Sequence, residues 1–216
     1  MGFSPSSGLR VTASSAIESC RTTVVGDFIN LRPLRVEDAE LTLAWRLKPR
    51  AFLLNKGAQT VREQRVWIEE RPAHELNYIL ETSAGVSVGM LSLIDVDFVH
   101  RRAESARFLI GDEEAVRGIP AAVEAMKHLY GLAFDRLGLL RVYGTVVEDN
   151  RLMLKWQLYL GMKEEGRLRQ HIFMNGRFQD LISLGILEPE YRRTALPRMN
   201  ALIAMAARQQ AVGKES

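Results

Sequence analysis

The loop DEEAVRGIPAAVEA, residues 112–125, has the composition of a phosphate-binding turn. In it, acidic residues and Arg117-Gly118 lead through Pro120 into a helix-forming run. At a helix N-terminus the backbone N–H groups point outward and the helix dipole favours a negative ligand, so such a turn can hold a phosphate. Gly118 would let the ligand approach the backbone, whereas Pro120 has no N–H to donate. A plain loop-to-helix junction, with proline at the first helical position, is the alternative.

The composition excludes several other kinds of site. The chain has 216 residues, of which 47% are hydrophobic and 25% charged, as in an ordinary globular protein. Its net charge is only +3 and the Lys and Arg residues form no basic block, so we expect no nucleic-acid partner. Cys20 is the single cysteine, and we expect no metal. No apolar run approaches the roughly 18 residues of a membrane span and no signal peptide is evident, which predicts a cytoplasmic protein without a membrane span.

The periodicity of the apolar residues predicts the helices and strands that position this loop. Residues 1–26 are rich in Ser, Thr and Gly and predict a disordered or flexible extension, residues 27–190 form the folded domain, and residues 191–216 form a C-terminal helix and tail. FINLRPL at 28–34 predicts the first strand. Helices are expected in VEDAELTLAWRLK and in TVREQRVWIEE, where Thr60 and Glu63 have capping-box spacing.

The remaining segments predict how the sheet is connected. NYILE, VSVGMLSLIDV and ESARFLIG form an antiparallel meander. A helix from Val123 and the strand LLRVYGTVV then make a crossover between two parallel strands, and Asn175-Gly176 predicts a terminal hairpin. The expected fold is therefore α/β (α+β), with a mixed, mainly antiparallel sheet, one parallel crossover and helices on both faces.

This order of elements resembles the GNAT superfamily of acetyl-CoA-dependent N-acetyltransferases over roughly residues 27–190. The resemblance rests on RGIPAAVEA, AFDRLGLLRVYGTVVEDN, LYLGMKEEGRLR and NGRFQDLISLGIL at the expected separations. The family pattern in the turn is Gln or Arg, two residues, Gly, one residue, then Gly or Ala. Here Ala115, Gly118 and Pro120 occupy these positions, so one of the three is kept.

The resemblance implies that acetyl-CoA lies between two splayed parallel strands. Its pantetheine arm would pair with main-chain groups of one strand, and its phosphates would bind the turn. The implied residues are Phe108, Leu109, Ile110, Gly111 and Asn150 along the arm, and Arg117, Gly118, Ile119, Ala121, Ala122 and Val123 at the phosphates.

The acid–base groups are less clear from the sequence. Many members of the family use a Tyr seven residues after the strand-terminal Asn as the acid, but Gln157 stands at that position here. Tyr159 and Tyr143 are the hydroxyls that remain nearby, although a tyrosine at such a position is more often a packing residue. Because amines in this fold approach from the start of the internal strand, Glu104 and Ser105 are the candidate bases. Glu148, Asp149 and His171 are alternatives.

The missing acid favours an acceptor amine that is only weakly basic. A lysine-like amine, with a pKa near about 10.4, is mostly protonated at neutral pH, whereas an α-amine near about 8 needs less help. LRPLRVEDAELTLAWR, EQRVWIEE and EEGRLRQHIFMNGRFQD are similar to GNAT enzymes that acetylate nucleotide-linked amino sugars for surface polysaccharides. On that resemblance Trp45, Arg46, Arg101 and His171 would contact the sugar nucleotide, although Trp45 could instead be helix core.

We therefore expect an N-acetyltransferase that acts on a small-molecule amine, preferably a sugar nucleotide. A ribosomal-type protein N-terminal acetyltransferase is the second reading. A non-catalytic acyl-CoA-binding domain is the third. The sequence is also compatible with a homodimer.

Overall fold

A computed structural model describes residues 13–54 and 57–214 of the chain. Its centre is a seven-stranded sheet in the order β1-β2-β3-β4-β5-β7-β6. The strands are β1 (Ile29–Pro33), β2 (Leu76–Thr82), β3 (Ser87–Asp97), β4 (Arg102–Ile110), β5 (Arg141–Val147), β6 (Lys163–Met174) and β7 (Arg177–Leu187). All neighbouring strands are antiparallel except β4 and β5, so the expected mixed sheet with one parallel crossover is confirmed.

The parallel pair β4 and β5 separates soon after it begins. The two strands pair only through Arg102–Arg141, Ala103–Val142 and Glu104–Tyr143. Beyond that point β4 still pairs with β3, and β5 still pairs with β7, while their facing edges part. Gly144 sits at the start of the gap, where a β-carbon would lie 3.0 Å from the Ser105 carbonyl oxygen. The gap therefore opens in the middle of the sheet.

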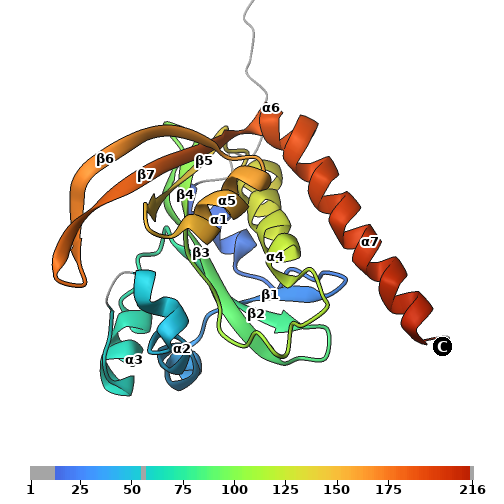
Figure 1. The fold of residues 1–216 in the computed structure, drawn as a ribbon, viewed down its shortest axis with the longest axis horizontal. Coiled ribbons are helices and arrows are strands. Elements are labelled where there is room, and N and C mark those ends of the chain that lie inside the picture. The colour runs from blue at the N-terminus through green and yellow to red at the C-terminus, as the bar shows by residue number, and fades with distance from the viewer. Residues whose placement is uncertain (1–12, 55–56, 215–216) are drawn as a thin grey trace, which may run out of the picture.

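Helices cover both faces of the sheet (Figure 1). One face carries α2 (Ala39–Arg46) and α3 (Val61–Glu69), where Trp45, Ile79, Met90 and Leu109 form a small core cluster. The other face carries α1 (Ala13–Cys20), α4 (Ala121–Tyr130), α5 (Arg151–Tyr159) and α7 (Leu196–Lys214) around the main core. The short helix α6 (Glu188–Glu190) and a π-helical turn at Tyr191–Ala195 precede α7, and a second π-helical turn at Gly131–Arg136 extends α4.

A buried carboxylate fixes α4 against the start of the sheet. Glu124 is 1% exposed, and its oxygens accept hydrogen bonds from the backbone N–H groups of Asp27, Phe28 and Ile29 at 2.7–2.8 Å. A carboxylate that accepts several backbone hydrogen bonds tolerates burial without a cationic partner. This contact anchors the helix whose N-terminus follows the loop at 112–120.

The local signals read from the sequence form as expected. Thr60 Oγ1 accepts from Glu63 N at 3.2 Å, and Glu63 reaches back to the Thr60 N–H, which makes the capping box at the start of α3. Asn175 and Gly176 both have positive φ, of 55° and 79°, at the turn between β6 and β7. These values match the turn type that an Asn-Gly hairpin requires.

The prediction for the N-terminal extension needs a correction. Residues 1–12 lie outside the described part of the chain, but α1 folds onto the main core with Ile17 and Cys20 buried. The Tyr78 hydroxyl donates a hydrogen bond to the Cys20 carbonyl oxygen, and Val24 forms a β-bridge with Leu31. Ile17 and Cys20, on a segment that otherwise consists of Ala, Ser and Glu, are enough to dock one short helix.

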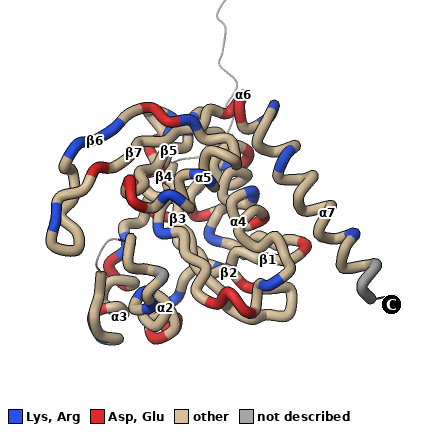
Figure 2. Tube along the Cα trace, viewed as in Figure 1, with Lys and Arg blue, Asp and Glu red and all other residues tan. Residues whose placement is uncertain are grey.

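Figure 2 shows Lys and Arg interspersed with Asp and Glu along the trace. None of the helices in the described residues is both long enough and apolar enough to span a bilayer. The C-terminal helix predicted from the sequence is α7, which packs Met199 and Ile203 into the main core beside α4.

Candidate active site

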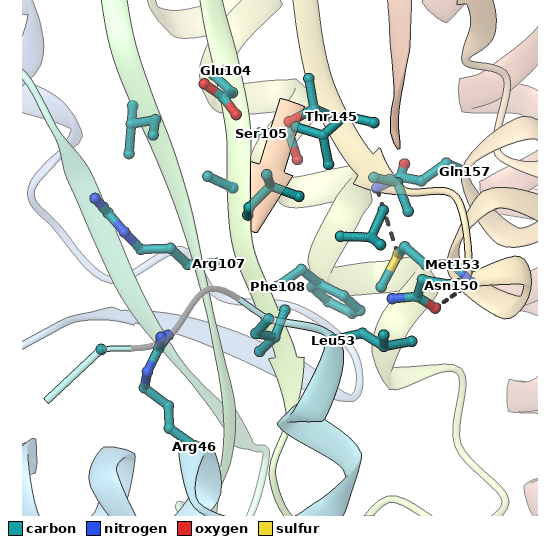
Figure 3. A pocket seen from close by; sticks show the side chains of 18 of the residues that line it. Arg46, Leu53, Glu104, Ser105, Arg107, Phe108, Thr145, Asn150, Met153 and Gln157 are labelled. Atoms are coloured by element: carbon teal, nitrogen blue, oxygen red, sulfur yellow. Dashed lines mark hydrogen bonds between the residues drawn. The ribbon is translucent and has the colours of Figure 1, made fainter. Parts of the chain in front are cut away.

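A cavity of about 640 Å³ opens where β4 and β5 part. Its walls come from β4, β5, α5, the loop before α3 and the β6–β7 hairpin. Figure 3 shows Arg46 and Arg107 on one side of the cavity, Asn150, Met153 and Gln157 on the other, and Phe108 between them. The volume lies in the range of small-molecule sites, which is about 300–1,000 Å³.

The gap in the sheet leaves main-chain groups without strand partners at the cavity. From Ser105 onward, the β4 edge that faces β5 has no strand partner. An unpaired strand edge offers N–H and C=O groups to an extended ligand in the way that another strand would. The β4 backbone is further distorted by a bulge, because Met90 pairs with Leu109 while Ser92 pairs with Ala106. Arg107 lies in this bulge with φ of 56°, in the left-handed region.

The polar wall on α5 contains an unsatisfied amide. Asn150 caps α5, since its Oδ1 accepts from Met153 N at 3.2 Å. Two turns further along, Gln157 is 6% exposed, and its Oε1 has no hydrogen-bond partner. Its Nε2 has only the Met153 sulfur, at 3.9 Å. A buried amide left without a partner is costly, so a molecule that enters the cavity and bonds to Gln157 would remove that cost.

Glu104 is the one carboxylate among the described residues that line the cavity. It pairs with Tyr143 at the last rung before the strands part. Burial, and then the negative charge of Asp95, raise the pKa of the Glu104 carboxyl above its usual value, partly offset by Arg107. Burial also raises the pKa of the Tyr143 hydroxyl, with Glu104 and Asp95 adding to the effect. A carboxyl group with a raised pKa at a cavity is a candidate proton acceptor.

The loop at 112–120 lies outside the residues that line the cavity. Helix α4 begins at Ala121, so Pro120 is the residue that precedes the helix. The sequence had instead suggested that Pro120 is the first helical residue. The Pro120 carbonyl accepts from Glu124 N at 3.0 Å. The N–H groups of Ala121, Ala122 and Val123 belong to the first helical turn and have no acceptor within the helix.

The rest of the loop is compatible with an anion beside it. Gly118 has φ of 79°, and a β-carbon there would meet nothing within 4 Å, so this side of the turn is open. The Arg117 side chain is exposed and pairs with Glu114, while Ile119 N bonds to Val116 O. Arg117 and Ile119 therefore have partners inside the loop, and the open groups are Gly118 and the first turn of α4.

The structure brings only part of the predicted site together. Glu104, Ser105, Phe108, Asn150, Arg46 and His171 all line the cavity, and Tyr143 adjoins Glu104 in the sheet. The side chains of Leu109 and Ile110 are buried, and a β-carbon on Gly111 would lie 2.1 Å from the Trp45 ring. These three residues can contribute only main-chain groups.

Three other predictions are corrected by position. Trp45 is 3% exposed and packs with Ile79 and Met90, so it belongs to the core as the alternative reading had it. Arg101 donates to the Gly138 carbonyl at 2.6 Å in the loop before β5. This contact lies just before β4 and β5 begin, at the end where the two strands are still paired. Tyr159 is half-exposed near Arg198 of α7, whose guanidinium lies 5.1 Å from its ring centroid. Among the described residues, neither Arg101 nor Tyr159 lines the cavity.

Sequence reasoning missed two contributors to the site. Arg107 reaches the cavity because of the β4 bulge, and Trp67 reaches it from α3. The strand pattern carries no signal for a bulge at that residue. The Phe108 ring stacks on Trp156 of α5, with centroids 4.9 Å apart and planes 14° apart, and so connects the two walls. No group of three or more His, Cys, Asp or Glu that could hold a metal ion occurs among the described residues.

Comparisons with known proteins agree on one family. Residues 29–163 match the model of the acetyltransferase (GNAT) domain. A spermidine N(1)-acetyltransferase of Vibrio cholerae serotype O1 is 27% identical over 117 residues, which are 54% of this chain and 66% of that protein. The corresponding enzyme of Escherichia coli K12 is 29% identical over 54% of this chain and 61% of its own length. The chain thus spans less than two thirds of the length of these two relatives.

A relative from Bacillus subtilis (strain 168) matches over a longer region. It is called "Putative ribosomal N-acetyltransferase YdaF" and is 29% identical over 180 residues, 79% of this chain and 97% of its own length. Among solved structures, a GCN5-related N-acetyltransferase from Brucella melitensis superposes with a TM-score of 0.73 at 21% identity, covering 85% of this chain and 86% of that one. The spermidine N-acetyltransferase of Vibrio cholerae in complex with CoA and spermine gives 0.69 at 22% identity, covering 78% and 100%.

Proposed function

Because the chain belongs to the GNAT acetyltransferase domain family, we propose that it transfers an acetyl group from acetyl-CoA to the nitrogen of a primary amine. The observation that carries this proposal is the opening between β4 and β5, where an unpaired strand edge, a cavity and a raised-pKa carboxyl meet. A metal is not part of the proposal.

The residues present fit acetyl-CoA. The free edge of β4 from Ser105 onward would pair with an extended amide-containing arm, and Asn150 and Gln157 offer side-chain amides on the opposite wall. Gly118 and the first turn of α4 would hold its phosphates, since that turn is open and its N–H groups have no acceptor within the helix. When bound, acetyl-CoA would supply the activated acetyl thioester.

On the acceptor side, Glu104 would take the proton that the amine must lose. It points into the cavity from the rung where the strands part, and its raised pKa brings it closer to the range useful for proton transfer at neutral pH. Gln157 stands where an acid would be useful, but an amide side chain cannot give up a proton. It can donate a hydrogen bond through Nε2, so leaving-group stabilisation would come from hydrogen bonding.

Three acceptor classes remain to be separated. The named relatives include spermidine and ribosomal-type acetyltransferases, so a polyamine and a protein N-terminus are both candidates. None of the relatives reported above is named for the nucleotide-linked amino sugar that the residues suggested. The activity itself also has to be distinguished from binding of an acyl-CoA without catalysis.

The test combines CoA binding with an amine panel. Calorimetry with CoA should show a single site, and a thiol reagent should detect CoA release when acetyl-CoA is mixed with spermidine, glucosamine, or a peptide with a free N-terminus. The control is each amine without protein. Steady CoA release with any amine excludes the non-catalytic reading. CoA binding without release from a broad panel would favour that reading, and no binding at all would overturn the proposal.

A further inference from the structure

One face of β5 and β7 changes from polar to apolar along the two strands. Because side chains alternate along a strand, Tyr143, Thr145 and Val147 of β5 share this face. Their partners on β7 are Gly185, Ser183 and Leu181. Tyr143 also pairs with Glu104 of β4, so the polar end of the face lies at the candidate base. Val147 is four residues further along β5, which corresponds to about 13 Å.

The apolar end of this face is covered by two other segments. Leu53, the last residue of a 3-10 turn at Pro49–Leu53, and Ile172 of β6 pack there against a cluster of buried residues. The cluster consists of Val147, Met174 and Leu181. Four of these side chains also line the cavity, and we call them the apolar wall: Leu53, Val147, Ile172 and Leu181. The cavity is therefore bounded on this side by part of the hydrophobic core.

The charged side chains near the apolar wall pair with one another outside the cavity. Arg167 donates to Glu148 at 3.0 Å and to Asp180 at 2.9 Å, and Arg177 donates to Asp149. None of these five residues is among the described residues that line the cavity. A cation buried against the apolar wall would thus have no carboxylate beside it, which is costly.

The other parts of the cavity already have partners or proposed roles. Arg107 is held by Glu75 at 2.7 Å and by Asn77 at 2.8 Å. The β4 edge and the amides of α5 are assigned to acetyl-CoA, and Glu104 to the proton of the amine. Figure 3 shows Glu104 at one end of the cavity and Leu53 at the other. The apolar wall is the part that neither acetyl-CoA nor the proton transfer uses.

We propose that the acceptor amine carries an apolar group, which packs on the apolar wall while its nitrogen reaches Glu104. This inference rests on the proposed acetyltransferase function and specifies its acceptor. The length of the face between Glu104 and Val147 fits an amine whose apolar group lies several bonds from the nitrogen. Each methylene group that leaves water for such a wall favours binding about four-fold. A polyamine would instead place a second cation there.

Alkylamines of increasing length test the apolar group at constant basicity. From ethylamine through butylamine to heptylamine, we expect kcat/KM to rise by about ten-fold or more, because successive methylene groups reach the wall. The matched control is 1,6-diaminohexane, which has the length of heptylamine but an ammonium group in place of the terminal methyl. Its kcat/KM should be about ten-fold or more below that of heptylamine.

A pair of peptides identifies where the apolar group comes from. The two peptides have a free N-terminus and differ only in the first residue, which is leucine in one and serine in the other. A preference for leucine without a chain-length effect among the alkylamines identifies the acceptor as a protein N-terminus. A chain-length effect among the alkylamines without a preference between the peptides identifies it as a small amine.

Variants then assign the preference to the apolar wall. Ile172→Val and Ile172→Thr have the same shape and both suit a strand, but the second puts a hydroxyl in place of a methyl. Ile172→Thr should reduce the preference for the apolar acceptor about three-fold or more relative to Ile172→Val. Leu53→Gln should reduce it as well, whereas Leu41→Gln, at a position of α2 that is 37% exposed, should not. CoA affinity, measured by calorimetry, should be equal in all four variants.

Three outcomes would overturn the inference while leaving the proposed function standing. The first is the absence of an apolar preference in both the alkylamines and the peptides. The second is a kcat/KM for 1,6-diaminohexane or spermidine above that of every apolar amine. The third is a preference that Ile172→Thr and Leu53→Gln leave at full strength. If CoA neither binds nor is released with any amine, the proposed function itself fails and the inference falls with it.

Discussion

At the scale of single residues, the proposed chemistry depends on how Glu104 is held. Its carboxylate must be ionised to accept a proton, so the acetylation rate should fall as the pH drops through its raised pKa. Asp95 contributes to that raised pKa through its negative charge. Asp95→Asn should therefore move the acidic limb of the kcat/KM profile to lower pH, and Glu104→Gln should lower kcat about 100-fold or more and remove that limb.

The control for this pH prediction is Glu40→Gln, which removes an exposed carboxylate from α2. Its pH profile should match that of the unaltered protein, because exposed charges that are far from the cavity are screened by salt. An acidic limb that stays in place in Asp95→Asn would show that another group sets it. Retained activity in Glu104→Gln would remove Glu104 from the role of base.

Gln157 offers a prediction in which activity and stability should separate. If its amide donates to the leaving group, Gln157→Leu should lower kcat about 100-fold, as loss of one preorganised donor does in other enzymes. The same change should leave the free energy of unfolding equal or higher, since the Oε1 atom is buried without a partner. Steady-state kinetics and urea unfolding together test this. Loss of stability with unchanged kcat would mean that the amide is structural.

At the scale of elements, the turn before α4 is the segment that the proposed function assigns to the phosphates of CoA. Gly118 has φ of 79°, so any side chain there costs about 1 kcal/mol of strain, although a β-carbon would meet nothing within 4 Å. Gly118→Asp adds a negative charge where phosphates are expected and should weaken CoA binding about 100-fold or more. Gly118→Ala adds the strain without the charge and should weaken it far less. Equal affinity in all three proteins, measured by calorimetry, would place the phosphates elsewhere.

A feature of this structure can be predicted from the sequence when the residues that form it are close together along the chain. The capping box at Thr60, the Asn175-Gly176 hairpin and the β4–α4–β5 crossover follow from short patterns, and the structure confirms each of them. The bulge that turns Arg107 into the cavity depends on the pairing of β3 with β4, which no local pattern encodes. Trp45 shows the same limit, because a helix stripe predicts burial but not whether it faces the core or the site.

At the scale of the whole molecule, the core reaches beyond the segment that matches the family model. That segment covers residues 29–163, whereas α1 precedes it and α7 follows it. Both helices bury apolar side chains in the main core, Ile17 and Cys20 from α1 and Met199 and Ile203 from α7. The two flanking helices thus act as parts of the folding unit, covering the face of the sheet opposite α2 and α3 (Figure 1).

If α1 is part of the folding unit, a buried residue of α1 that does not line the cavity should still affect the stability of the domain. Ile17 is 6% exposed in the main core, so Ile17→Ala should lower the free energy of unfolding by about 2–4 kcal/mol, through lost burial and the cavity left behind. Val25 is 75% exposed, and Val25→Ala should change it by less than about 0.5 kcal/mol. Urea unfolding measures both. Equal stability in the two variants would mean that α1 packs only loosely. The predicted loss, with CoA affinity retained at low denaturant, would show that α1 stabilises the domain without shaping its site.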